Sequence, residues 1–258
     1  YVLLNERGVI AGFPKMYDNH IADWAAGRAR AAGLRMSAET AEFFVSWAGS
    51  DMRHIANEID KLATGLDEGA EITEKAIREL TTTSDDQFVY QIFDAALDGN
   101  GNEALRLLDL SLKGSAQPLF ITATLGAVMR DMWQARSLID RGYFKQLGDR
   151  YSRDRALAAV GSVSVADRTA VCGPEKSGLL SGNIYKVFLS IKRARLLPLS
   201  TIEGIMQRLL DIDCRFKGIR RPMPGSEESV LQQLIADISF VAKKNKAAAA
   251  KTAPRKRY

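Results

Sequence analysis

Histidine, cysteine and paired acidic residues are the side chains of this sequence that could support metal binding or catalysis. The two histidines, His20 and His54, are far apart, and neither lies in an HExxH or comparable metal-binding spacing. The two cysteines, Cys172 and Cys214, lack CxxC partners, so we expect two buried, reduced thiols instead of a zinc site or a disulfide framework. The sequence therefore predicts no metal site.

The acidic pairs 85–86 and 227–228 are better explained by helix capping than by catalysis. Both pairs fall where helices are expected to start, and carboxylates there complement the positive end of the helix dipole. The sequence also lacks a GxxxxGK[ST] phosphate loop and a GxSxG nucleophile elbow. We therefore predict no catalytic residues, no cofactor and no small-molecule substrate.

Helices are the elements expected to position every polar side chain of this chain. After Pro14, apolar residues recur at spacings of three and four between short polar or glycine breaks, which is the pattern of packed amphipathic helices. A small helical block is expected over residues 18–84. Its four helices are predicted to begin near Asp18 or Asn19, at caps Ser37 and Ser50 or Asp51, and at cap Thr73.

A second, larger helical block is expected over residues 85–242. Pro118 is well placed in the first turn of its longest helix, because the N–H group that proline lacks would have no partner there. The predicted helices of this block cover approximately residues 87–98, 102–113, 118–141, 152–160, 165–173, 183–196, 200–216 and 227–242.

Both ends of the sequence differ from this helical pattern. Strand-forming residues flank a predicted turn at 5–8, so we expect residues 1–17 to be the last β remnant of a preceding, truncated domain. The overall charge of +5 resides in residues 243–258, because the remaining chain has 29 basic and 31 acidic residues. We expect this basic tail to be disordered and either solubilising or loosely attracted to phosphate.

Three segments, taken together, resemble the delta subunit of bacterial DNA polymerase III, a clamp-loader component. Residues 49–62, GSDMRHIANEIDKL, are similar to the lid-domain pattern of that family, and an Ile72-Thr73 helix start follows. Residues 88–100, FVYQIFDAALDGN, resemble the start of the family's collar domain, and residues 209–218 resemble its last-but-one helix. The resemblance covers residues 14–242 and is weakest over 143–182.

The resemblance implies an all-α lid and collar, preceded by the end of an AAA+-like domain. The lid would be 18–84 and the collar 85–242. The chain would then be a non-catalytic, cytoplasmic subunit of the bacterial DNA polymerase III holoenzyme that helps to open the sliding clamp and load it onto primed DNA during replication. The collar would contact the other loader subunits, whereas the family's AAA+-like domain, mostly absent from this sequence, grips the clamp. We expect no membrane association, because no run of about 18 apolar residues is present.

The family resemblance also makes DNA contact by the collar an expectation. Aromatic rings can stack on bases, and Lys or Arg can neutralise phosphate. The candidate residues are Tyr185, Lys192, Arg193, Arg220 and Arg221. Each of them has an ordinary alternative role as a core tyrosine or a solvated charge.

Two other functions are compatible with this sequence. The basic tail and the arginine-rich stretches at 192–195 and 220–221 are also compatible with a free-standing helical DNA-binding protein. A helical lid separated from an active ATPase would have a similar helical pattern. Assembly surfaces are expected on the helices at 183–196 and 200–216, where an apolar face with a polar rim would suit a protein partner.

Overall fold

The computed structural model describes residues 18–114, 116–174, 178–222 and 224–252. Within these ranges the protein consists of α-helices, one 3₁₀ turn and a single isolated bridge between Arg35 and Glu71. The predicted all-α class is therefore confirmed. The predicted β remnant in residues 1–17 lies outside the described residues.

The first bundle, residues 18–84, contains four helices. Two of their predicted caps are confirmed: the hydroxyl of Ser37 accepts from the Thr40 N–H, and that of Thr73 accepts from the Ala76 N–H. Of the two cap candidates before the third helix, Asp51 is the one used, and its carboxylate accepts from the His54 N–H at 2.8 Å. The helices are α2 (Asp18–Ala31), α3 (Ala38–Ala48), α4 (Met52–Gly65) and α5 (Glu74–Leu80).

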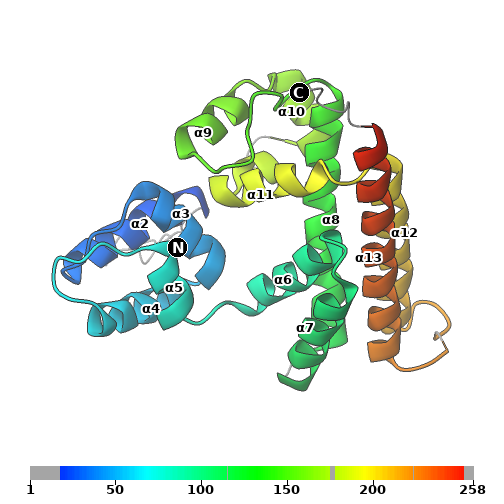
Figure 1. Cartoon of the computed structure of the whole chain (residues 1–258), viewed down its shortest axis with the longest axis horizontal. Coiled ribbons are helices and arrows are strands. Elements are labelled where there is room, and N and C mark those ends of the chain that lie inside the picture. The colour runs from blue at the N-terminus through cyan, green and yellow to red at the C-terminus, as the bar shows by residue number, and fades with distance from the viewer. Residues whose placement is uncertain (1–17, 115, 175–177, 223, 253–258) are drawn as a thin grey trace, which may run out of the picture.

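The second bundle contains the remaining helices, and α8 runs through its centre (Figure 1). Pro118 occupies the first turn of α8, as predicted. The elements are α6 (Asp85–Leu97), α7 (Gly101–Gly114), α8 (Pro118–Asp140), α9 (Arg153–Gly161), α10 (Val165–Cys172), η1 (Leu179–Ser181), α11 (Ile184–Ala194), α12 (Leu199–Phe216) and α13 (Glu227–Thr252).

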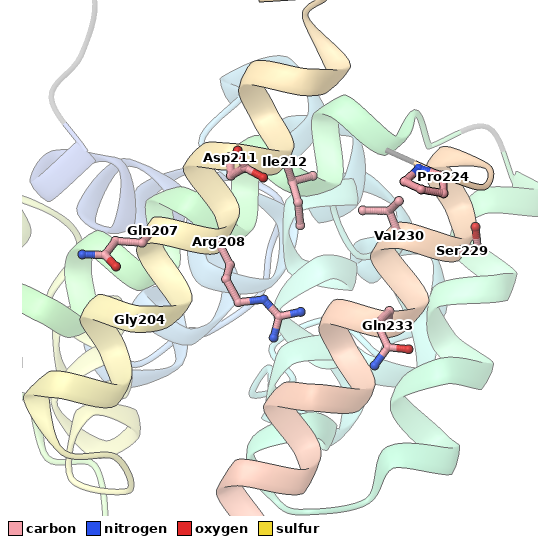
Figure 2. A pocket seen from close by; sticks show the side chains of 9 residues that line it. All are labelled: Gly204, Gln207, Arg208, Asp211, Ile212, Pro224, Ser229, Val230 and Gln233. Atoms are coloured by element: carbon pink, nitrogen blue, oxygen red, sulfur yellow. The ribbon is translucent and has the colours of Figure 1, made fainter. Parts of the chain in front are cut away.

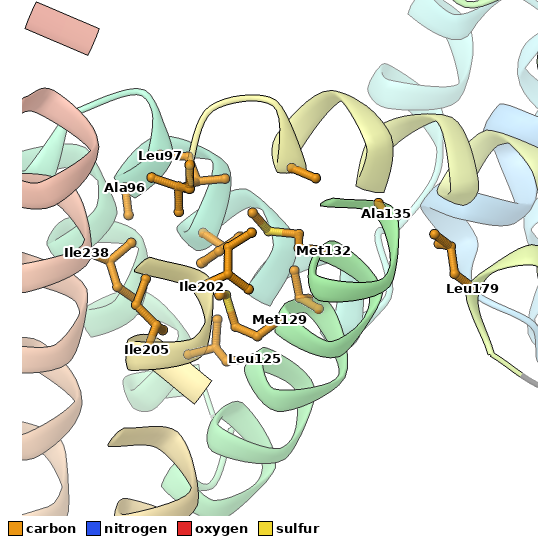
Figure 3. Packing of buried hydrophobic residues seen from close by; sticks show 14 of the residues in the cluster. Ala96, Leu97, Leu125, Met129, Met132, Ala135, Leu179, Ile202, Ile205 and Ile238 are labelled. Atoms are coloured by element: carbon orange, nitrogen blue, oxygen red, sulfur yellow. The ribbon is translucent and has the colours of Figure 1, made fainter. Parts of the chain in front are cut away.

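Each bundle has its own hydrophobic cluster. Phe44, Ile55, Ile59 and Leu62 are fully buried in the first bundle. In the second, α8 packs against α6, α11 and α12, and its apolar side chains meet those of α12 and α13 (Figure 3). The buried side chains labelled there include Leu125, Met129, Met132, Ile202, Ile205 and Ile238.

Helix α13 corrects the prediction for the C-terminal tail. The helix continues to Thr252, ten residues beyond its predicted end, so the expected disorder of residues 243–252 is wrong. Packing of Val230, Leu234 and Ile238 holds the earlier turns in place, and the alanine run then extends the helix at little cost because alanine has the highest helix propensity. Lys246 also pairs with Asp98 at 2.9 Å.

The segment 81–84 connects the two bundles and is bonded to the first. The Thr82 N–H donates to the Glu58 carboxylate at 2.8 Å, and the Ser84 N–H donates to the Trp47 carbonyl at 3.0 Å. Gly49, at φ +86°, ends α3 so close to this segment that a β-carbon there would lie 3.3 Å from that of Ser84. The Ser84 hydroxyl also accepts from the Gln87 N–H and caps α6, so the segment is bonded to both bundles.

Candidate functional site

Two of the predicted DNA-contact residues make contacts within the protein: Tyr185 is partly buried, and Arg193 is buried. The Tyr185 ring stands edge-on to Phe43 at 5.7 Å and to Tyr151 at 4.8 Å between ring centroids, and burial raises the pKa of its hydroxyl. The Arg193 side chain is 8% exposed and makes a bidentate ion pair with Asp94. Ring packing for Tyr185 and an ion pair for Arg193 therefore account for the positions of both side chains.

The other three predicted DNA-contact residues lie on the surface. Lys192 is exposed on α11, and Arg220 and Arg221 are exposed after α12. Arg220 pairs with the Asp211 carboxylate, which lies on α12 and also accepts from Arg215. Three of the five residues are therefore on α11 and two follow α12, and DNA contact by any of them remains a prediction.

The acidic pairs lie at helix starts, as predicted, whereas Glu58 of α4 is buried and not on the helix surface. Helix α6 begins at Asp85, and α13 begins at Glu227. The Glu58 carboxylate pairs with Lys61, three residues later on the same helix, at 2.6 Å. Among the described residues, no group of three or more His, Cys, Asp or Glu side chains is arranged to hold a metal ion.

The cysteines differ in burial from the prediction. Cys172 is buried, but Cys214 is only half-buried, so the expectation of two buried thiols is half wrong. The difference follows from position: Cys172 faces η1 and the 178–180 turn, whereas Cys214 lies in the last turn of α12, where the helix leaves the bundle core.

A groove lies between helices α12 and α13 at the end where the two are joined (Figure 2). Ile212 and Val230 form its apolar part, and Arg208 reaches from α12 to an ion pair with Asp237 of α13 at 2.7 Å. The volume is about 480 Å³. The lining residues are Gly204, Gln207, Arg208, Asp211, Ile212, Pro224, Ser229, Val230 and Gln233.

Exposed apolar side chains also mark these two helices and the segment between them. Leu210 of α12 is 60% exposed, Ile219 is 71% exposed, and Phe240 of α13 is 70% exposed. By contrast, Phe188 and Ile191 of α11 are buried within the protein, so the apolar face expected there is not available to a partner. Of the two predicted assembly helices, only α12 therefore presents exposed apolar surface of this kind.

Sequence reasoning missed the contribution of α13 to this exposed surface. The buried stripe of α13 contains Leu231, Leu234, Ile235 and Ile238. By helical spacing, Phe240 falls outside this stripe. An aromatic residue off the core-facing side of a helix was the sequence signal that could have predicted this exposed surface.

A second polar site lies where the two bundles meet. We define the bundle junction as Glu39 and Glu42 of α3, Tyr151 and Arg153 at the start of α9, and Asn183 before α11. The Arg153 backbone N–H donates to the Glu39 carboxylate at 3.1 Å. The Asn183 amide donates to the Glu42 carbonyl at 3.5 Å while its oxygen caps α11. Helix α3 is therefore attached to the second bundle at two places.

The Glu42 side chain is the most unusual group of the bundle junction. It is 5% exposed, and Arg153 Nε lies 3.7 Å from its Oε1, beyond hydrogen-bonding distance. Burial raises the pKa of Glu42 to about 7, against the opposing effect of Arg153. Glu42 Oε2, Arg153 Nε and Tyr151 Oη are all buried without a hydrogen-bond partner.

The fold defines a class: a small helical bundle followed by a larger one, built around a central long helix. No family model and no curated protein matches the sequence. Among solved structures, the DNA clamp loader delta protein YqeN of Bacillus subtilis matches with a TM-score of 0.58 and 17% sequence identity. The match covers 92% of this chain and 60% of that protein, so the chain spans three fifths of its length and has a clamp-loader-delta-like fold.

None of the helices in the described ranges is both long enough and apolar enough to cross a membrane.

Proposed function

We propose that this chain is a non-catalytic subunit of a bacterial DNA clamp loader, in which residues 18–84 are the lid and residues 85–242 the collar. The observation that carries the proposal is the fold likeness to a clamp loader delta protein over 92% of the chain. The ordered sequence resemblance over residues 14–242 supports it independently, because it rests on residue identities and not on backbone shape.

The collar is proposed to assemble with other loader subunits through α12 and α13. These helices carry a groove with an apolar floor and polar edges, and Leu210 and Phe240 are exposed elsewhere on the same two helices. A buried apolar centre with a polar rim is the usual composition of a protein interface. Leu210 would be covered in the assembled loader.

The proposed role is mechanical and uses no reacting group in the chain. The lid would transmit movement between the collar and the clamp-gripping part of the loader, and the assembly would place the clamp on primed DNA. Segment 81–84 supports this role because it is bonded to the lid through Thr82 and Ser84 and to the collar through the Ser84 cap of α6, so it connects the two directly.

The test is size-exclusion chromatography with light scattering on the chain alone and mixed with the other loader subunits of the same organism. We expect a defined complex in the mixture and weak DNA binding by the chain alone. Full-length delta serves as the positive control for partner folding. A chain that fails to associate under these conditions, but binds DNA tightly by itself, would instead be a free-standing DNA-binding protein, as the exposed Lys243 and Lys244 of α13 would allow.

A further inference from the structure

The bundle junction contains a buried acid whose position is determined by two parts of the chain that are distant in sequence. Glu42 lies on α3 of the lid, whereas Arg153, Tyr151 and Asn183 belong to the collar. Three buried polar atoms of the junction, Glu42 Oε2, Arg153 Nε and Tyr151 Oη, lack hydrogen-bond partners, so the set is incompletely satisfied. Such a set is sensitive to a single added or removed proton.

The charges around Glu42 do not compensate fully for its ionised form. Arg153 is the one cation placed against it among the described residues, at 3.7 Å, and it also approaches Asp23 of α2 at 3.9 Å. Asp23 itself repels the Glu42 carboxylate. Glu39, on the same helix, accepts from the Arg153 backbone and therefore adds another negative charge to the junction.

The charged groups on the other helices that pack against α3 are turned to other partners. On α5, Arg78 lies over the rings of Phe43 and Trp47. On α4, the Glu58 carboxylate pairs with Lys61 and accepts from Thr82. On α11, Tyr185 presents an aromatic ring, not a charge, to the junction.

We propose that a proton on Glu42 holds the lid against the collar, and that loss of this proton releases the lid. Docking with Glu42 ionised removes a carboxylate from water without a close hydrogen bond from Arg153. Docking with Glu42 protonated avoids this cost, and the carboxyl O–H becomes a donor in a junction where the Tyr151 hydroxyl lacks a partner. The proton comes from solvent and returns to it.

The direction of the pH dependence follows from linkage. The pKa of Glu42 is raised in the docked form, so the docked form binds the proton more tightly than a form with Glu42 in water. Docking is therefore strongest at low pH and is lost as the pH rises through about 7. Between pH 8.5 and 5.5 the ratio of docked to released molecules should rise roughly 30-fold. This pH-dependent docking of the lid would occur whether or not the chain acts in a clamp loader.

The experiment is a distance measurement across the bundle junction in the full chain by double electron–electron resonance. Nitroxide labels are attached to Lys75→Cys on α5 and Lys192→Cys on α11, both exposed positions, after Cys172→Ala and Cys214→Ser replacement. We expect a short-distance population that grows from pH 8.5 to 5.5. A distance distribution that is unchanged over this range would contradict the proposed pH-dependent release of the lid.

Three variants connect the response to Glu42. Glu42→Gln should remain in one state across the pH range, because the neutral amide cannot titrate. Glu68→Gln, at an exposed position of the first bundle outside the bundle junction, should keep the pH response and is the matched control. Arg153→Gln should move the midpoint to higher pH, because a cation that favours the ionised form is lost. A Glu42→Gln variant that titrates like the parent chain, or a midpoint that moves to lower pH in Arg153→Gln, would contradict the proposal.

Discussion

The guanidinium of Arg193 on α11 makes two hydrogen bonds to the carboxylate of Asp94 on α6, at 2.6 and 2.8 Å. The same guanidinium lies 5.2 Å from the centre of the Tyr90 ring. Arg193 therefore joins the helix that enters the collar to the helix that contacts the lid. Its neighbour Lys192 points into solvent, so adjacent basic residues have opposite roles.

Arg193→Ala should destabilise the protein by about 1–3 kcal/mol, because Asp94 loses a charged hydrogen-bonding partner and the collar loses a buried side chain. Lys192→Ala should change stability by less than about 0.5 kcal/mol. Urea denaturation followed by circular dichroism measures both. Equal midpoints for the two variants would show that the ion pair contributes nothing to stability.

The stability of the folded chain should decrease as the pH rises from about 5 to 8. Glu42 has a raised pKa of about 7 when folded, so its contribution is present at low pH and is lost as the pH passes through that value. The loss is at most about 3 kcal/mol for this shift. Glu42→Gln should flatten this part of the profile and be the more stable protein at pH 8, as thermal unfolding at several pH values can establish.

Two glycine replacements should have opposite effects. Gly178→Ala should cost about 1–3 kcal/mol, because φ is +73° and the added β-carbon would lie 2.5 Å from the Cys172 carbonyl oxygen. Gly126→Ala, inside α8 with nothing within 4 Å of the added carbon, should stabilise by about 0.5–1 kcal/mol. Melting temperatures that move in the same direction would refute this pair of predictions.

Leu210→Glu should prevent the chain from co-eluting with loader partners while leaving its melting temperature unchanged. Leu210 is 60% exposed, so the substitution removes no core packing, but it would place a charge in the proposed interface. Val165→Glu, on α10 with a 78% exposed parent residue, is the control and should still co-elute. Normal assembly of Leu210→Glu would exclude this position from the interface.

Simultaneous replacement of Arg220 and Arg221 by Ala should weaken binding of primed DNA by the assembled loader and make it less dependent on salt. Removal of one Lys or Arg contact to phosphate lowers the slope of log affinity against log salt concentration by about 1. Arg220 should contribute less than Arg221, because Arg220 already pairs with Asp211. DNA affinity measured at several salt concentrations provides the test. An unchanged affinity and slope would remove both residues from the DNA-contact candidates.

Much of the local structure of this protein is determined by the sequence alone. The caps Ser37 and Thr73, the first-turn Pro118 and the apolar spacing of residues 52–62 predict helices correctly because each acts within one or two turns of chain. The Glu58–Lys61 pair follows in the same way from helical spacing. These interactions do not depend on how the bundles pack.

Only the tertiary structure decided which polar side chains are buried and which apolar ones are exposed. Glu42 is buried by residues that follow it by more than 100 positions, and Arg193 finds Asp94 at a separation of 99 residues. Helical spacing separates Phe240 from the buried stripe that contains Ile238, but the packing of α13 against α6 and α7 decided that Phe240 stays 70% exposed. Burial depends on contacts between distant segments, whereas helix formation depends mainly on neighbours, and this difference separates the predicted helices from the candidate sites that sequence reasoning missed.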